Sequence, residues 1–185
     1  MSDYNTLRHG SSDFFTNVED TSFETTNVDV WWLTSNFVAR STPILNFERE
    51  TTLSSEFQSG ATKGDAMSFD STSGLFTFPQ TGLWKISGNW TTYYSQSTYS
   101  LRQAQYFMKA TKDNNSTSIS FLNNTQNMED NDMKLTGSYV TTFNCENTST
   151  DKIFYQWYKL SNTSGNYVLG SSTLAYTTVT FEKIG

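Results

Sequence analysis

The sequence predicts an all-β protein, and three observations support this. Charged residues make up only 16% of the 185 residues and aromatic residues another 16%, while Thr, Ser and Asn fill much of the remainder. Thr, Phe, Tyr and Trp suit a pleated surface, whereas Ser and Asn suit turns. From Val30 onward, short apolar runs alternate with clusters of Gly, Asn, Ser and Asp, which is typical of a β-sandwich or barrel.

The length predicts one folded domain with an N-terminal extension. A chain of 185 residues can bury one hydrophobic core. Residues 1–30 are polar and acidic, so we expect an extended arm there and the folded domain over residues 31–185. The arm carries the aromatic side chains Phe14, Phe15 and Phe23, which we expect to dock it onto neighbouring chains.

About ten strands are expected, because apolar runs of strand length are separated by turn residues and no helical period is present. The expected strands are 36–40, 43–48, 65–69, 75–79, 82–94, 103–111, 117–123, 135–146, 152–160 and 173–183. The side chains expected to form the core around the 69–90 hairpin are Phe69, Phe76, Phe78, Trp84, Ile86 and Trp90.

Two expected strands carry apolar side chains on both faces. In strand 152–160, Tyr155 and Trp157 lie on one face and Phe154 and Tyr158 on the other. The last strand repeats the pattern, unless a twist or bulge before Val179 reconciles its faces. An aromatic face left in water usually marks an association surface. The pattern therefore favours a homo-oligomer, and the alternative is a thick monomeric core with Tyr hydroxyls at its edge.

Charge and hydropathy make several partners improbable. The formal net charge of −6 and the pI near 4.7 argue against nucleic acid, which needs clustered Lys and Arg. No apolar run is long enough to span a membrane, and the first residues do not resemble a secretory signal.

The single cysteine, Cys145, is expected to be a buried small hydrophobe in a protein made in a reducing cytoplasm.

The residues give little support for catalysis. His9 is the only histidine and lies in the arm, far in sequence from Cys145, so Ser-His-Asp, Cys-His and multi-His sites are not expected. A pair of carboxylates, as in a glycosidase, stays open because two acids need only meet in space. Glu129, Asp130 and Asp132 could supply oxygen ligands to calcium, but they lack the EF-hand spacing and its Gly. We therefore expect no enzyme and no cofactor.

Several segments resemble the signature of the complement globular head and the tumour-necrosis-factor-like superfamily over residues 36–185. They are Phe37-Val-Ala-Arg40, Pro43-Ile-Leu-Asn-Phe47, Phe69-Asp70, Gly74-Leu-Phe-Thr-Phe-Pro79 and Gly82-Leu-Trp-Lys-Ile86. Trp84 stands where that signature has Tyr. Asp151-Lys152-Ile153 is similar to another family segment, with Thr150 in place of its Gly. The closing residues 174–185 resemble the last strand of phage and viral members.

This resemblance implies a ten-stranded jelly roll that forms a tight homotrimer, with aromatic side chains packed around the threefold axis. The side chains expected at this trimer interface are Phe37, Tyr155, Trp157, Tyr158, Tyr176 and Phe181. Secreted animal members have a signal peptide or membrane anchor and often a collagen stalk, and the sequence shows neither feature. The resemblance therefore favours a phage or virus structural protein.

The expected function is a virion structural protein made in the host cytoplasm. It would be a capsid decoration or a tail knob, anchored to other virion proteins through its arm. The alternative is a head that binds a glycan or protein on the host surface, with Tyr93, Tyr94 and Tyr99 available to stack on sugars. A jelly-roll enzyme acting on carbohydrate is the weaker alternative.

Overall fold

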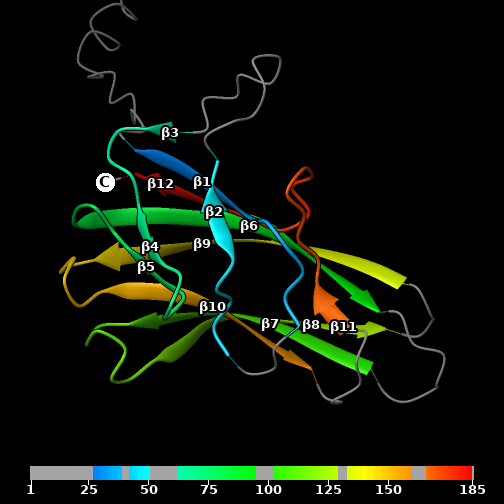
Figure 1. Ribbon diagram of the computed structural model, residues 1–185. Helices are drawn as coiled ribbons and strands as arrows, with labels where there is room; N and C mark the ends of the chain where they lie inside the picture. The colour runs from blue at the N-terminus through cyan, green and yellow to red at the C-terminus, as the bar shows by residue number, and fades with distance from the viewer. Residues whose placement is uncertain are drawn as a thin grey trace, which may run out of the picture.

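The computed structural model describes residues 27–38, 42–50, 62–94, 102–128, 133–159 and 166–184, and these form two antiparallel β-sheets packed face to face (Figure 1). The strands are β1 (Val28–Leu33), β2 (Phe47–Arg49), β3 (Thr62–Lys63), β4 (Ser68–Asp70), β5 (Leu75–Thr77), β6 (Gly82–Tyr94), β7 (Arg102–Thr111), β8 (Ile119–Met128), β9 (Met133–Cys145), β10 (Lys152–Lys159), β11 (Asn166–Val168) and β12 (Thr178–Lys183). The predicted all-β sandwich is confirmed.

The two sheets have seven and five strands. The seven-stranded sheet runs in the order β11-β6-β12-β1-β2, with β3 also paired to β1 and β9 paired to β6. The five-stranded sheet runs β4-β5-β10-β7-β8. The first and last strands, β1 and β12, are adjacent and antiparallel, so the two ends of the described fold lie in one sheet.

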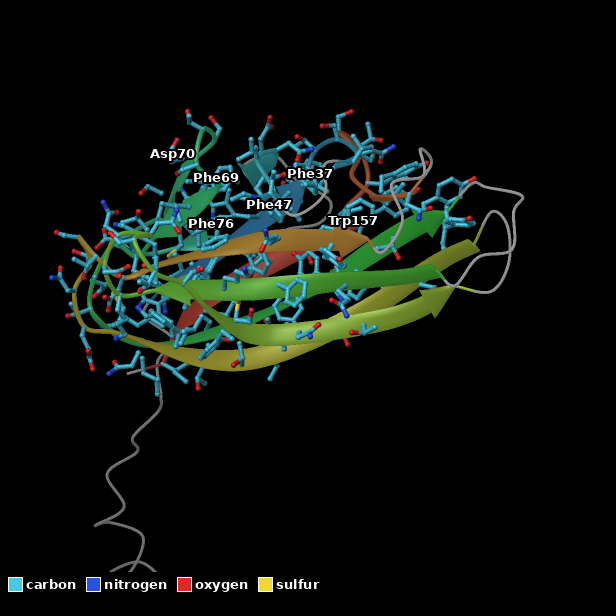
Figure 2. The ribbon with its side chains drawn as sticks, turned by 90° about the horizontal axis from the view of Figure 1, so that it is seen from below. Phe37, Phe47, Phe69, Asp70, Phe76 and Trp157 are labelled. Carbon is cyan, nitrogen blue, oxygen red and sulfur yellow. The ribbon has the colours of Figure 1, made fainter. Side chains whose placement is uncertain are left out.

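The core forms where the apolar faces of the two sheets meet. Along β6, Trp84, Ile86 and Trp90 are fully buried, as their alternation with polar residues predicts. Of the side chains expected in the 69–90 hairpin core, Phe76 and Phe78 are also buried and Phe69 is partly buried against the core. Figure 2 shows Phe47, Phe69 and Phe76 grouped together, with Trp157 lying further along the sandwich.

The sheet begins before the expected boundary at residue 31. Strand β1 starts at Val28, within the segment that was expected to belong to the arm. Its Asp29 is fully buried and accepts hydrogen bonds from Arg49 Nε at 2.6 Å, Trp31 Nε1 at 2.9 Å and the Met67 backbone N at 2.8 Å. These donors supply the partners that make a buried carboxylate tolerable.

Two expected strands differ in the described residues. Of the expected strand 36–40, the structure describes residues 36–38, where Phe37 makes an isolated bridge to Val168 of β11, a strand that was not predicted. Within 43–48, Pro43 makes one bridge to Gln156, and regular pairing starts only at β2. The last strand begins at Thr178, so the change of face expected before Val179 falls in the loop that precedes β12.

The turn between β4 and β5 contains Asp70 and Gly74, two residues of the sequence signature, and its geometry gives each of them a structural role. Asp70 accepts hydrogen bonds from the Thr72 backbone and the Ser73 hydroxyl, and its own carbonyl accepts one from the Gly74 backbone N at 2.7 Å. Gly74 has a φ of +75°, and a Cβ there would lie 2.7 Å from the Pro43 Cβ. The turn therefore requires glycine for both its conformation and its close packing.

Candidate subunit-binding face

Most side chains expected at a trimer interface lie instead inside the single chain, and this is a correction. Tyr155, Trp157 and Phe181 have no exposed surface, and Phe37 is 9% exposed. They point between the two sheets and belong to the core. Phe154, on the opposite face of β10, is also buried, so the two apolar faces of β10 do not by themselves require a neighbouring subunit.

The other two expected interface residues are partly exposed. Tyr158 is half-buried, and the alternation along β10 places it on the outer side of the five-stranded sheet. Tyr176 is half-buried in the loop before β12, where its carbonyl accepts hydrogen bonds from Asn89 Nδ2 at 2.7 Å and Thr91 Oγ1 at 2.9 Å. These bonds hold Tyr176 beside β6.

The interior contains titratable groups that are kept neutral by burial. Burial raises the pKa of Tyr106, Tyr139 and Tyr155 above the ordinary value for tyrosine. Burial also raises the pKa of the Cys145 thiol to about 11. At neutral pH these groups keep their protons, which fits a structural role for the core and for Cys145.

The surface that stands out is the side of the seven-stranded sheet that faces away from the core, here called the outer face. Its side chains come from alternate positions of β1, β12, β6 and β9, and the register aligns them in rows across the sheet. One row is Val30, Thr180, Ser87 and Val140, and the next is Trp32, Thr178, Asn89 and Ser138.

None of the eight side chains in these two rows is ionisable. The row beside them contains Lys85 and Glu182, which pair with each other at 2.7 Å. Val140 is 66% exposed. Depletion of charge in the central patch and retention of charge at its border are features of protein–protein interfaces.

Aromatic side chains lie at the β11 end of the outer face. The rings of Tyr93 and Tyr167 are 5.1 Å apart, and the Lys134 ammonium lies 5.5 Å from the centre of the Tyr176 ring. Tyr94 was expected to be exposed, but the alternation of β6 turns it into the core, where it is 1% exposed. Tyr99 lies outside the described residues.

Comparisons with solved structures identify the fold. The chain matches no family model and no curated protein sequence. It superposes on the Eiger TNF of S. frugiperda with a TM-score of 0.62 and 11% identity, covering 88% of this chain and 94% of that one. Murine APRIL gives a TM-score of 0.56 and 10% identity, covering 85% and 98%. The chain has a TNF-like jelly-roll fold.

A third similar structure is the globular domain of a zebrafish complement 1qA protein, at a TM-score of 0.49 and 12% identity over 86% of this chain and 95% of that one. At the identities of the Eiger and APRIL structures, the likeness shows the TNF-like jelly-roll fold and not a shared activity. This is the fold that the sequence resemblance to the TNF-like superfamily implied. The described fold has twelve strands where about ten were expected, because β1, β3 and β11 were not foreseen and the described part of the expected strand 36–40 makes only an isolated bridge.

The outer face of the jelly roll was not found from the sequence. Its members, such as Val30, Thr180 and Val140, come from strands that are far apart in the chain. The alternation along 82–94 correctly gave the two faces of β6. Which strands flank β6, and so which side chains join its polar face, depends on strand order.

Several expected site residues lie outside the described residues. They are Phe14, Phe15 and Phe23 of the arm, His9, and the calcium candidates Glu129, Asp130 and Asp132. Within the ranges that the structure describes, no group of three or more His, Cys, Asp or Glu side chains is arranged to hold a metal ion. The same ranges contain no helix long and apolar enough to cross a bilayer.

Proposed function

We propose that this chain is a binding or structural head, not an enzyme, and that three copies assemble through the outer face of the seven-stranded sheet. The observation that carries the proposal is the pair of uncharged rows across β1, β12, β6 and β9, with Val140 largely exposed at their edge. The resemblance to the TNF-like superfamily implies a trimer, and the outer face supplies a surface for it. In this proposal the outer face forms the trimer interface, and the buried residues that were expected there from the sequence belong to the core of each subunit.

The dimensions of the outer face suit this role. Strands β6 and β9 have 13 residues each and strands β1 and β12 have six each. At about 3.3 Å per residue they extend roughly 43 Å and 20 Å, and each strand adds about 4.8 Å of width. The resulting patch is on the order of 600 Å² per subunit, close to the roughly 800 Å² that one partner contributes to a standard interface. Burying uncharged side chains there avoids the cost of desolvating unpaired ions.

We further propose that the trimer is a component of a phage or virus particle, as a capsid decoration or a tail knob, with residues preceding β1 attaching it to other virion proteins. The support is the resemblance of residues 174–185 to the closing strand of phage and viral members, together with Phe23 and the acidic side chains of the N-terminal segment. Mass spectrometry of purified particles from the virus or host that encodes the chain would test this role. Absence of the chain from those particles would refute it without affecting the trimer.

The trimer is tested by light scattering on the purified chain. The expected mass is three times 21.0 kDa, about 63 kDa. A second protein lacking residues 1–26 should give a trimer of the shorter chain. The truncation must stop there, because removing residues 1–30 would delete half of β1. A stable species of 21.0 kDa for the full chain would refute the trimer.

A second candidate function is recognition of a host-surface glycan or protein. The observation that favours it is the ring pair of Tyr93 and Tyr167 near Lys134, since aromatic rings can pack against sugar faces. Binding of the purified trimer to a glycan array or to host cells, reduced by Tyr167→Ala, would support this function. A carbohydrate-active enzyme is less favoured, because the groove described below has no carboxylate in its lining.

A further inference from the structure

An apolar groove opens between β8 and β9, the edge strands of the two sheets. It has a volume of about 310 Å³, at the small end of the range of roughly 300–1,000 Å³ for ligand pockets. Ile119 and Phe121 of β8 line one side, and Thr142 and Phe143 of β9 line the other. Ile119 is 68% exposed and Phe121 is 36% exposed, so two large apolar side chains meet water at the rim.

A β-bulge directs Phe121 toward the groove. Lys109 of β7 pairs with Ser120 and Met108 pairs with Leu122, which leaves Phe121 as the additional residue on β8. The Phe121 ring lies 6.0 Å from the Phe143 ring, edge to face. Phe143 is stacked on Phe78 at 5.2 Å. The groove is therefore an open continuation of the aromatic core.

The charged group at the rim already has partners. Lys112 donates to the Asn144 carbonyl at 2.9 Å and contacts the carboxylates of Glu146 at 3.1 Å and Asp151 at 3.2 Å. Its ammonium also lies 5.3 Å from the centre of the Phe143 ring. An anionic ligand would compete with these carboxylates, so the groove suits an uncharged aromatic occupant.

We propose that Phe14 and Phe15 of the same chain occupy this groove. The chain enters the fold at Asn27, whose carbonyl accepts a hydrogen bond from the Lys183 backbone N. Lys183 pairs with Trp84, and Trp84 pairs with Phe143, so Asn27 and the groove lie at the same end of the sheet. Three strand spacings separate them, about 14 Å.

Chain length selects this pair over the other phenylalanine of the segment. Twelve residues connect Phe15 to Asn27 and can extend over as much as about 40 Å, whereas the four residues from Phe23 reach about 14 Å only when fully stretched. The rest of residues 1–26 is mostly polar, with five acids and one arginine, a net charge of −4, and its apolar side chains are isolated from one another in the sequence. Phe14 and Phe15 are therefore the largest adjacent apolar side chains of the segment, and the short connection to Asn27 raises their effective concentration at the groove.

This docking involves one chain and does not depend on the trimer or on a particle. Disulfide trapping in the full-length protein tests it. Asp13→Cys, next to Phe14, is combined with Thr142→Cys at the exposed rim of the groove, and oxidised glutathione is added to dilute protein. Cys145 does not interfere, because it is 1% exposed and burial keeps its thiol protonated. We expect an intramolecular disulfide that is detected by its peptide mass.

The matched control is Thr6→Cys with Thr142→Cys, since residue 6 also reaches the groove but has no aromatic neighbour. We expect trapping at residue 13 to be about tenfold faster than at residue 6. Adding Phe14→Ser and Phe15→Ser to the Asp13→Cys/Thr142→Cys protein should lower the rate of disulfide formation to that of the control, while the circular dichroism spectrum stays that of a folded β-sheet protein. The proposal would be overturned if the disulfide to Thr142→Cys formed equally fast from residues 6 and 13. It would also be overturned if Phe14→Ser and Phe15→Ser did not change the rate of disulfide formation. Disulfide-linked dimers would overturn it too, in favour of a neighbour's segment in the groove.

Discussion

The hydroxyl of Tyr139 donates a hydrogen bond of 3.0 Å to the hydroxyl of Tyr155 in the interior of the sandwich. Tyr139 lies on β9 of the seven-stranded sheet and Tyr155 on β10 of the five-stranded sheet, so the bond connects the two layers. Both residues are buried, and each ring also packs near Tyr106. The core is therefore fixed by a polar contact as well as by aromatic packing.

Replacing Tyr139 by Phe should lower the free energy of unfolding by about 1–3 kcal/mol, because it leaves the buried Tyr155 hydroxyl without this donor. Urea denaturation measures the loss. The double variant Tyr139→Phe/Tyr155→Phe should cost less than the sum of the two single variants, since no hydroxyl of the pair is then left unpaired. Additive costs would show that the bond contributes nothing to stability.

Alkaline pH should destabilise the fold through the buried tyrosines. Burial raises the pKa of Tyr106, Tyr139 and Tyr155 in the folded state. The unfolded chain therefore loses these protons first, and the stability they provide is present below about pH 10 and declines as pH rises further. Each tyrosine contributes up to about 1.4 kcal/mol per pH unit. Urea midpoints at pH 9, 10 and 11 should fall, and fall less steeply in Tyr139→Phe.

Removal of the Asp29 carboxylate should destabilise the N-terminal strand severely. Asp29→Ala leaves Arg49, the Trp31 indole and the Met67 backbone without their shared acceptor, and breaking a buried pair costs about 3–5 kcal/mol. Thermal melting followed by circular dichroism measures the change. Asp65→Ala, at an exposed position, is the control and should shift stability by less than about 0.5 kcal/mol. A loss as small as that of the control would show that the Asp29 contacts are dispensable.

A charge placed at the β9 edge of the uncharged rows of the outer face should dissociate the trimer. Val140→Arg puts a cation among the uncharged rows, and three copies would bring like charges together without partners. Light scattering should then give a mass near 21.0 kDa with an unchanged β-sheet spectrum. Ile119→Arg is the matched control, because Ile119 is 68% exposed against 66% for Val140 but lies on the other sheet. Trimers in both variants would exclude the outer face as the interface.

The sequence by itself determined the local pattern of the longest strand. The period-two alternation over 82–94 correctly placed Trp84, Ile86 and Trp90 in the core, and the strand has the predicted bounds. This succeeded because successive side chains of a strand point to opposite faces whatever the neighbouring strands are. The glycine of the β4–β5 turn, Gly74, is a second local feature, because its φ of +75° is a requirement of the turn itself.

Only the tertiary structure decided what lies beside each strand. Asp29 looked like part of a solvated acidic arm, but Arg49 and Met67, which are distant in sequence, donate hydrogen bonds to it together with the neighbouring Trp31. Tyr155 and Trp157 looked like an unburied second face until the opposite sheet covered them. The outer face is likewise assembled from four strands whose order no local pattern encodes, because contacts distant in sequence depend on how the whole sandwich closes.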